Sequence, residues 1–238
     1  MQRLFDDRKL TIDVQRLFDI KKTQLQMVQD RGYNITPDEE LILTTNYQGF
    51  QQYLRTLTNT NPGRMTRSLL SRSYIKILPN GTEQRMLVFF GGKTDTQKKQ
   101  VSTEVVREFI GTIQKYQFHE AILIVDAALS SMAEKILEGL KLTKWQVFFD
   151  PNLTFNVARH VDVHQHELLS LEETSEVLKQ LRVDLSKLPI IYSKDPVIRY
   201  YGWESGRVVR VHRNDQAVSV LSPNSINYRV IVASPTNK

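Results

Sequence analysis

Hydrophobic and polar positions follow a helical period in the first part of the chain. From residue 12 to residue 29 apolar side chains recur every three or four positions, and Gly32 follows as a stop signal. Signals for the start of a second helix follow. Thr36 can cap the helix, a proline suits its first turn, and Glu39 stands three residues after the cap. The pattern therefore predicts helices over 12–29 and 37–56.

The period changes to that of a mixed sheet between residues 73 and 149. Two alternating runs joined by an Asn-Gly pair at 80–81 predict a hairpin, and the continuous apolar run 120–126 is typical of a central strand buried on both faces. Helices are expected at 102–115 and 131–140, with a further strand at 145–149. This succession predicts an α/β sheet with right-handed crossovers.

A second, smaller unit begins near residue 156. An amphipathic helix is predicted over 171–181, and a short helix over 196–201 has Asp195 as its cap and Gly202 as its stop. Two strands, 206–213 and 228–232, complete this part. The fold class is thus α/β plus α+β in two domains, 1–155 and 156–238, with a short flexible tail after residue 232.

Composition narrows the class of protein. The 238 residues are 40% hydrophobic and 24% charged, which is typical of a soluble globular protein and excludes a disordered or fibrous chain. The net charge of +6 permits approach to a polyanion without demanding it. The absence of cysteine excludes disulfides, cysteine-ligated metals and thiol catalysis. We find neither a signal peptide nor the run of about 18 apolar residues that a membrane span needs, so we expect no membrane association and a cytosolic or nuclear location.

Three histidines between residues 160 and 166 are the strongest local signal for a metal. Imidazoles bind zinc, and alternation along a strand would place His160, His164 and His166 on one face. The alternative is a polar strand edge or turn with solvated or hydrogen-bonded rings. Because the spacing matches no fixed ligand pattern, we predict no metal and no cofactor.

Carboxylates of the first domain raise the alternative of a metal-dependent nuclease, which needs several of them gathered around a metal. The available residues are Glu83, Asp95, Glu120 and Asp126. They are scattered over strand ends without a motif, and we interpret them as a solvated rim. Neither a phosphate-binding loop at Phe89–Lys93 nor a serine nucleophile elbow is present.

Basic side chains gather near the end of the chain. Arg199, Arg207, Arg210 and Arg213 fall within fifteen residues, opposed only by Glu204. Such a cluster is suited to phosphate or an acidic partner subunit, but it also suits an exposed sheet face kept soluble by its charges. A stand-alone nucleic-acid-binding module therefore stays open beside the nuclease.

The segment LPIIYSKDPVIRYYGWESGRVVRVHR, residues 188–213, closely resembles the carboxy-terminal domain of the fifth subunit shared by eukaryotic nuclear RNA polymerases I, II and III. The corresponding archaeal polymerase subunit is similar over the same stretch. Upstream segments that match the family's order are 27–33, 88–90 and 121–125. The resemblance spans about Val14 to Val232 and is strongest after residue 156.

The resemblance implies a non-catalytic subunit. The family has an amino-terminal jaw domain beside downstream double-stranded DNA and a carboxy-terminal assembly domain that docks on the largest subunit; general transcription factors are further partners to expect. The implied docking residues are Asp195, Pro196, Arg199, Tyr200, Gly202, Gly206, Val208, Arg210, Tyr228 and Arg229. The implied DNA-proximal residues are Ser130, Ser131 and Lys135, whose loop and helix start would meet phosphate without reading sequence.

Departures from the family pattern indicate a divergent member. His164 stands where the family usually has proline, and the turn at Ser130–Met132 lacks its usual proline. We expect a specialised paralogue, or the version of a protist or a large DNA virus. The expected location is the nucleus, or the viral factory or virion if the source is viral.

Overall fold

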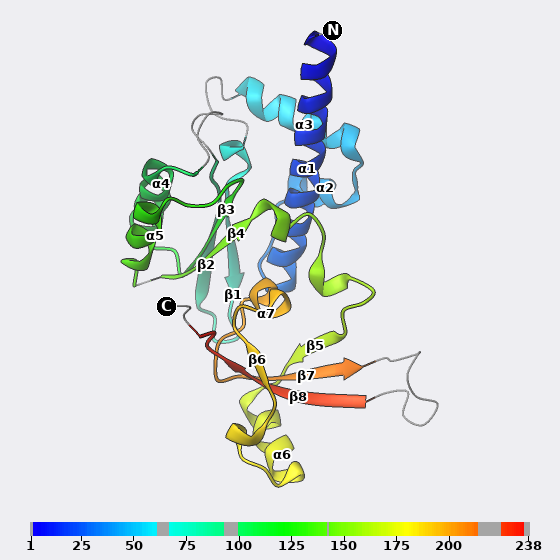
Figure 1. Ribbon diagram of the computed structural model, residues 1–238, viewed down its shortest axis with the longest axis vertical. Coiled ribbons are helices and arrows are strands. Elements are labelled where there is room, and N and C mark those ends of the chain that lie inside the picture. The colour runs from blue at the N-terminus through cyan, green and yellow to red at the C-terminus, as the bar shows by residue number, and fades with distance from the viewer. Residues whose placement is uncertain (1, 61–66, 93–99, 142, 214–224, 236–238) are drawn as a thin grey trace. The chain divides into compact units, whose positions relative to one another are not determined.

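The chain forms two compact units, residues 1–155 and 156–238, and each is a mixture of helices and strands (Figure 1). The computed structural model describes residues 2–60, 67–92, 100–141, 143–213 and 225–235, with the backbone alone described for residues 2–13. The predicted two-domain, mixed architecture is confirmed. Over the described ranges, no helix has both the length and the apolarity needed to cross a membrane.

Three helices open the first unit: α1 (Gln2–Asp30), α2 (Pro37–Thr44) and α3 (Tyr47–Thr60). The first helix begins well before residue 12, where we had placed its start. The prediction of one helix over 37–56 is wrong, because Thr45 takes an extended conformation and Asn46 accepts the backbone N–H of Gly49 at 3.0 Å through its Oδ1. An asparagine that satisfies the first free N–H groups starts a new helix.

The first sheet has the strand order β1-β2-β3-β4, formed by β1 (Arg72–Ile77), β2 (Glu83–Phe90), β3 (Glu120–Val125) and β4 (Lys144–Phe149). The first pair is antiparallel and the other two are parallel, so the mixed sheet predicted over 73–149 is confirmed. Helices α4 (Thr103–Tyr116) and α5 (Ser131–Glu138) supply the crossovers that parallel strands require.

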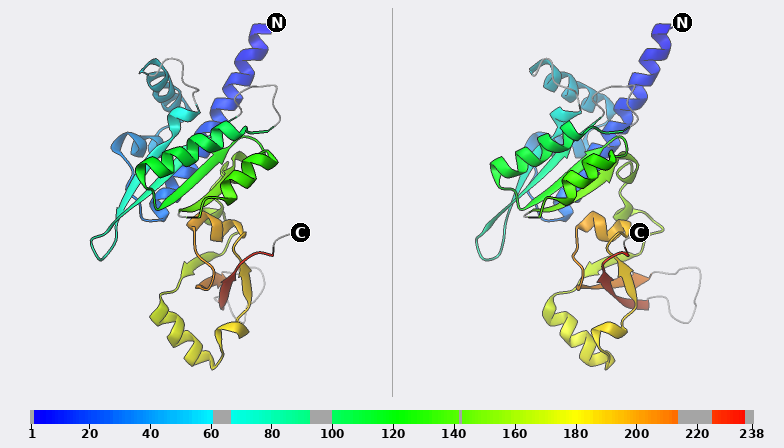
Figure 2. Two further views of the ribbon diagram at one scale, coloured as in Figure 1. Left: turned by 90° about the vertical axis from the view of Figure 1, so that its left-hand side faces the viewer. Right: turned by 60° about the vertical axis from the view of Figure 1, so that its left-hand side comes forward.

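The two faces of this sheet carry different cores. Leu123 and Phe89 lie in the core formed with α4 and α5, whereas Tyr74 and Phe90 belong to the opposite face and are buried beside α1. Figure 2 shows α4 and α5 on one side of the sheet and α1 on the other. Burial on both sides explains why β3 is apolar at every position from Ala121 to Val125.

The second unit is built on a sheet of order β5-β7-β8-β6. Its elements are β5 (Gln165–Leu168), α6 (Leu171–Leu181), β6 (Ile190–Tyr192), α7 (Pro196–Tyr201), β7 (Val208–Arg213) and β8 (Ser225–Val232). Both predicted helices are confirmed. Strands β5 and β6 were not predicted, and β7 begins at Val208 rather than at residue 206, because Gly206 turns the chain with φ +89°.

Short 3₁₀ helices connect these elements at Ser68–Leu70, Asp150–Asn152, Val157–Arg159 and Leu185–Lys187. After β8 the chain is held as far as Ser234, whose Oγ accepts the Lys194 N–H at 3.0 Å and whose N–H donates to Ser193 Oγ at 3.1 Å. The flexible tail after residue 232 stays a prediction. Residues 214–224 and 236–238 lie outside the described residues.

Helices α6 and α7 cover opposite faces of the second sheet. Val208 and Val230 pack with Val177 of α6, while Val209 and Ile231 pack with Ile198 of α7. Alternation along β7 and β8 therefore serves two small cores, each with its own helix.

Three helices of the chain end with the same pair of backbone hydrogen bonds, the Schellman motif. The residue in the left-handed conformation is Gly32 after α1, Gly202 after α7 and Arg182 after α6, with φ values of 82°, 69° and 54°. Glycine is the usual residue there because it has no Cβ to clash. Arg182 after α6 is not a glycine, and neither is Gln117, which takes a left-handed conformation after α4 with φ +53°.

Candidate functional site

The predicted docking segment is a short, firmly terminated helix. Asp195 caps α7, since its Oδ1 accepts the N–H groups of Val197 at 2.9 Å and Ile198 at 3.4 Å, and the exposed Pro196 fills the first helical position. At the other end Gly202 closes the Schellman motif. The predicted roles of cap and stop are confirmed, and they give α7 fixed ends.

Two residues of the predicted docking set lie inside the second unit. Tyr200 is 2% exposed and Val208 is fully buried. The Tyr200 hydroxyl accepts a hydrogen bond of 2.8 Å from Asn156 Nδ2, and its ring meets that of Tyr201 edge-on. Neither side chain is open to a partner, and both support α7 and the sheet from within.

The remaining predicted contact residues do not share one surface. Strand pairing places Arg210 opposite both Glu167 and Tyr228, on the face that carries α6, whereas Arg229 pairs with Val209 on the face that carries α7. Arg229 Nη1 donates to the Ile190 carbonyl at 3.2 Å. Arg199 of α7 is partly buried, and burial lowers the pKa of its guanidinium.

Arg210 is the centre of a cross-strand charge group. Its Nη1 lies 3.0 Å from Glu167 Oε2, and its guanidinium carbon lies 5.8 Å from the centre of the Tyr228 ring. His212 Nε2 lies 3.3 Å from the same carboxylate oxygen. The hydrogen bond to His212, with the contacts to Arg210, holds the pKa of Glu167 below its ordinary value.

The predicted DNA-proximal residues lie at the start of α5. Ser130 Oγ accepts the Ala133 N–H at 3.3 Å, so this hydroxyl caps the helix instead of facing solvent alone. Ser131 and Lys135 are exposed. Glu134 adds a negative charge to the same first turn, which opposes an approaching phosphate.

The three histidines do not lie on one strand face. Only His166 belongs to β5, and its Nδ1 lies 2.7 Å from the His164 carbonyl oxygen, while His160 Nδ1 lies 3.5 Å from Asp162 Oδ2. The strand alternation that the metal interpretation would need is not present over 160–166, because the chain turns before Gln165. Burial is the main reason that the pKa of His166 is lowered.

The nuclease carboxylates are likewise dispersed. Glu120 begins β3 and Asp126 follows its end, a separation of about 20 Å along an extended strand. Glu83 contacts Arg85, Glu120 lies 3.7 Å from Arg31, and Asp95 lies outside the described residues. In the part of the chain that the structure describes, no group of three His, Cys, Asp or Glu residues is arranged to hold a metal ion.

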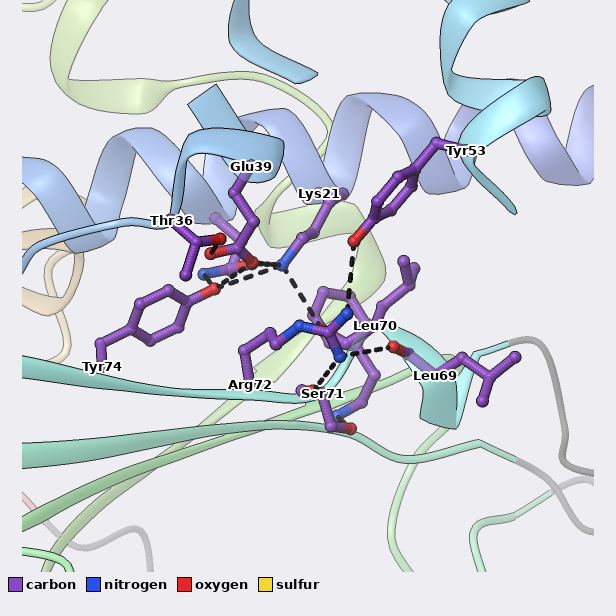
Figure 3. Close-up of polar contacts among 11 residues, drawn as sticks. Lys21, Thr36, Glu39, Tyr53, Leu69, Leu70, Ser71, Arg72 and Tyr74 are labelled. Carbon is purple, nitrogen blue, oxygen red and sulfur yellow. Dashed lines mark hydrogen bonds and ion pairs between the residues drawn. The ribbon is translucent and has the colours of Figure 1, made fainter. Parts of the chain in front are cut away.

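A buried polar cluster in the first unit was not predicted. Lys21 of α1 and Glu39 of α2 are both almost completely buried, and Figure 3 shows them meeting at Tyr74 of β1. Lys21 Nζ lies 2.8 Å from Glu39 Oε1, and the Tyr74 hydroxyl donates to that same oxygen at 2.8 Å. Lys21 Nζ also donates to Gln24 Oε1 at 2.9 Å. One ammonium thus fastens two helices and the edge of the sheet.

Burial dominates the electrostatics of this Lys21 cluster. It lowers the pKa of Lys21 against the attraction of Glu39, and it raises the pKa of Tyr74 well above the ordinary value. A signal for the cluster is present in the sequence: Lys21 falls on the same helical stripe as Phe18, Leu25 and Val28. A lysine on an apolar stripe calls for a buried partner.

At each predicted site, the polar side chains hold the chain's own elements together: they cap helices, pair across strands or join helices to a sheet. The class that this fold and these sites favour is an assembly or interaction protein of two units.

Comparison with known proteins gives the family. The model of the RNA polymerase Rpb5 N-terminal domain matches residues 11–113, and the model of the Rpb5 C-terminal domain matches residues 155–231. The Dictyostelium discoideum protein "DNA-directed RNA polymerases I, II, and III subunit rpabc1" is 30% identical over 224 residues, covering 92% of this chain and 99% of that protein. The chain belongs to the Rpb5 family, whose members are non-catalytic subunits of DNA-directed RNA polymerases.

Other relatives have comparable similarity. "DNA-directed RNA polymerases I, II, and III subunit RPABC1" of Caenorhabditis briggsae is 28% identical over 226 residues, covering 93% of this chain and 98% of that protein. "DNA-directed RNA polymerases IV and V subunit 5B" of Arabidopsis thaliana is 27% identical over 226 residues, covering 94% and 93%. The resemblance inferred from residues 188–213 is therefore confirmed, and so is the expectation of a divergent, non-enzymatic subunit.

Proposed function

We propose that this chain assembles into a DNA-directed RNA polymerase, with its second unit docked on the largest subunit and its first unit beside downstream DNA. The observation that carries the proposal is the presence of both Rpb5 domains, in order, on one chain that covers almost the full length of its relatives. The chain supplies no chemistry of its own in this role. It acts as a non-catalytic part of a larger enzyme.

For the second unit, we place the docking surface around α7. The cap at Asp195 and the turn at Gly202 fix the helix, and Lys194 and Pro196 are exposed at its start. A helix whose two ends are already fixed loses little conformational entropy on binding, which favours stable assembly. Arg199 is the basic contact that we assign to this surface, while Arg229 is the one assigned to the sheet.

For the first unit, the proposed DNA contact is made by Ser131 and Lys135 of α5 with the phosphate backbone. Both side chains are exposed, and contacts of this kind position DNA without reading its sequence. Glu134 limits the attraction. We therefore expect weak, salt-sensitive DNA binding by the isolated chain, and strong placement only within the polymerase.

The proposal is tested by affinity purification of the tagged full chain from its native source. The expected result is co-purification of the two largest polymerase subunits in stoichiometric amount. Asp195→Ala removes the α7 cap and should lower that recovery, while Ser131→Ala, which removes one exposed hydroxyl, should leave it unchanged. Ser130→Ala is unsuitable as a control, because Ser130 caps α5. Tagged protein that recovers no large polymerase subunit contradicts the proposal.

The proposed location is the nucleus, since the relatives with the printed names above serve the shared nuclear polymerases or their plant counterparts. A viral source would place the protein in a viral factory or virion instead. Transcription factors are further proposed partners of the first unit. Immunofluorescence with an antibody against the chain distinguishes a nuclear from a cytoplasmic location.

A further inference from the structure

An open groove of about 590 Å³ lies at the carboxyl end of α6, apart from the proposed α7 docking surface. Its lining comes from the last turns of α6 and the 3₁₀ turn Leu185–Lys187: Ser175, Leu178, Lys179, Arg182, Val183, Asp184, Leu185 and Lys187. The lining includes apolar and cationic side chains. Val183 and Leu185 are both more than a third exposed and present apolar surface to solvent.

Three cations surround this α6 groove, and only Asp184 opposes them. Lys179, Arg182 and Lys187 are exposed, and none of them forms a side-chain hydrogen bond or ion pair with the described residues. Three other arginines of this unit differ: the side chains of Arg210, Arg207 and Arg229 each hydrogen-bond within it. Lys179 and Arg182 complement the dipole of α6, but Lys187 lies in the following turn, where the dipole gives no reason for a cation.

The backbone under Arg182 is a second, independent observation. Its N–H donates to the Lys179 carbonyl at 3.2 Å, and the Val183 N–H donates to the Leu178 carbonyl at 3.2 Å. The corresponding position after α1 and after α7 is glycine, whereas Gln117 takes a left-handed conformation after α4 with φ +53°. At Arg182 the sequence has a cation at a position where glycine is the easier residue.

We propose that the α6 groove binds an acidic peptide segment of a partner protein, with its apolar side chains on Val183 and Leu185 and its carboxylates against Lys179, Arg182 and Lys187. The lining offers such a peptide apolar surface for its apolar side chains and three cations, without a partner among the described residues, for its carboxylates.

A nucleic acid fits this groove less well than a peptide. The lining contains no aromatic residue on which a base would stack, and the exposed aliphatic side chains would face a polar sugar-phosphate backbone. A ligand that offers only phosphate would make no apolar contact with Val183 and Leu185. The groove therefore favours a peptide that offers both apolar and acidic side chains.

The test uses the full chain and an array of synthetic 15-residue peptides in which leucine or phenylalanine is spaced among glutamate and aspartate. A matched array replaces every acidic residue by lysine. We expect binding to the acidic array only, and the tightest peptide, labelled with fluorescein, then gives a dissociation constant by anisotropy. Adding salt should weaken that binding.

Variants separate the groove from the fold. Arg182→Gly removes the cation at a position that favours glycine, so the melting temperature should stay equal or rise while the peptide binds about tenfold more weakly. Lys187→Ala should weaken binding to a similar degree. Lys194→Ala removes an equally exposed cation at the α7 surface and should leave the dissociation constant unchanged.

Three outcomes overturn the proposal. They are the absence of binding to any acidic peptide, an equal loss of affinity with Lys194→Ala, and tighter binding of a 24-base-pair DNA duplex or single-stranded RNA at the same residues. None of these results depends on whether the chain enters a polymerase, so the groove and the proposed assembly are tested separately.

Discussion

Lysine is used in opposite ways in the two units. Lys21 in the first unit is buried and surrounded by Glu39, Gln24 and Tyr74, whereas Lys187 in the second unit is exposed and has no ion-pair partner among the described residues. A buried charge must be neutralised within the fold, because water is not there to stabilise it. A solvated charge is free to meet a partner. Burial therefore separates cations that hold the structure from cations that suit recognition.

The largest loss of stability is expected for Lys21→Met, which tests the role of the buried lysine. The substitution leaves Glu39 buried without its ammonium partner, and removing one member of a buried pair costs about 3–5 kcal/mol. We expect a loss of that size in the free energy of unfolding of the full chain, measured by chemical denaturation. Lys22→Met is the matched control: Lys22 is only partly buried and its ammonium lies 5.8 Å from the Phe18 ring, so its loss should cost less than about 1 kcal/mol.

The double variant Lys21→Met with Glu39→Met identifies the cause. Replacing both charges by apolar side chains removes the uncompensated carboxylate, so it should recover most of the stability that Lys21→Met loses. A double variant as unstable as the single one would show that the hydrogen bonds to Gln24 and Tyr74, rather than the unpaired charge, account for the cost.

A smaller effect is expected at the turn after α7. Gly202 has φ +69°, and a β-branched residue is strained there, so Gly202→Val should cost about 1–3 kcal/mol of unfolding free energy. The same variant should also reduce recovery of the large polymerase subunits, since the turn fixes α7. Gly111→Ala is the control, and the opposite effect is expected. Gly111 lies inside α4 with nothing within 4 Å of an added Cβ, so alanine should stabilise the chain by about 0.5–1 kcal/mol. Equal losses for both variants would mean that the left-handed turn is not the reason.

Sequence periodicity predicted the regular elements well and the breaks between them poorly. The helices over 171–181 and 196–201 were predicted to the residue, because an apolar stripe, a cap and a stop signal coincide in each. The break at Thr45 and Asn46 was missed, since the apolar pattern continues through it. Strand β6 was missed because it has only three residues and is held by pairing with β8, a contact distant in sequence.

Site residues were predicted by type more reliably than by exposure. Asp195 and Gly202 act as the cap and the stop that their residue types indicate. Tyr200 and Val208 were named with the docking residues but are buried, because one sequence does not tell which face of a short helix or strand meets a core. Lys21 was not predicted, although its position on the apolar stripe indicates a buried partner. Which residues are that partner becomes known only when Glu39 and Tyr74 are seen to converge on it.

The smallest effect on the free energy of unfolding is expected at Glu167, whose charge group with Arg210 and His212 is exposed where the Lys21 cluster is buried. Glu167 accepts from Arg210 and lies beside His212, but it is 46% exposed, so water screens the interaction. Glu167→Gln should change the unfolding free energy at pH 7 by less than about 1 kcal/mol.

The pH dependence tests the same group more sharply. The pKa of Glu167 is lower in the folded chain, so the stabilisation that it provides is present above its unfolded value of 4.5 and is lost as the pH falls through the lower folded value. Between pH 7 and pH 3, Glu167→Gln should therefore lose slightly less stability than the unchanged chain. Denaturation curves at both pH values measure the difference. A cost above about 2 kcal/mol for Glu167→Gln at pH 7 would mean that this pair resembles the buried Lys21 cluster, and burial alone would then not separate the two kinds of charge.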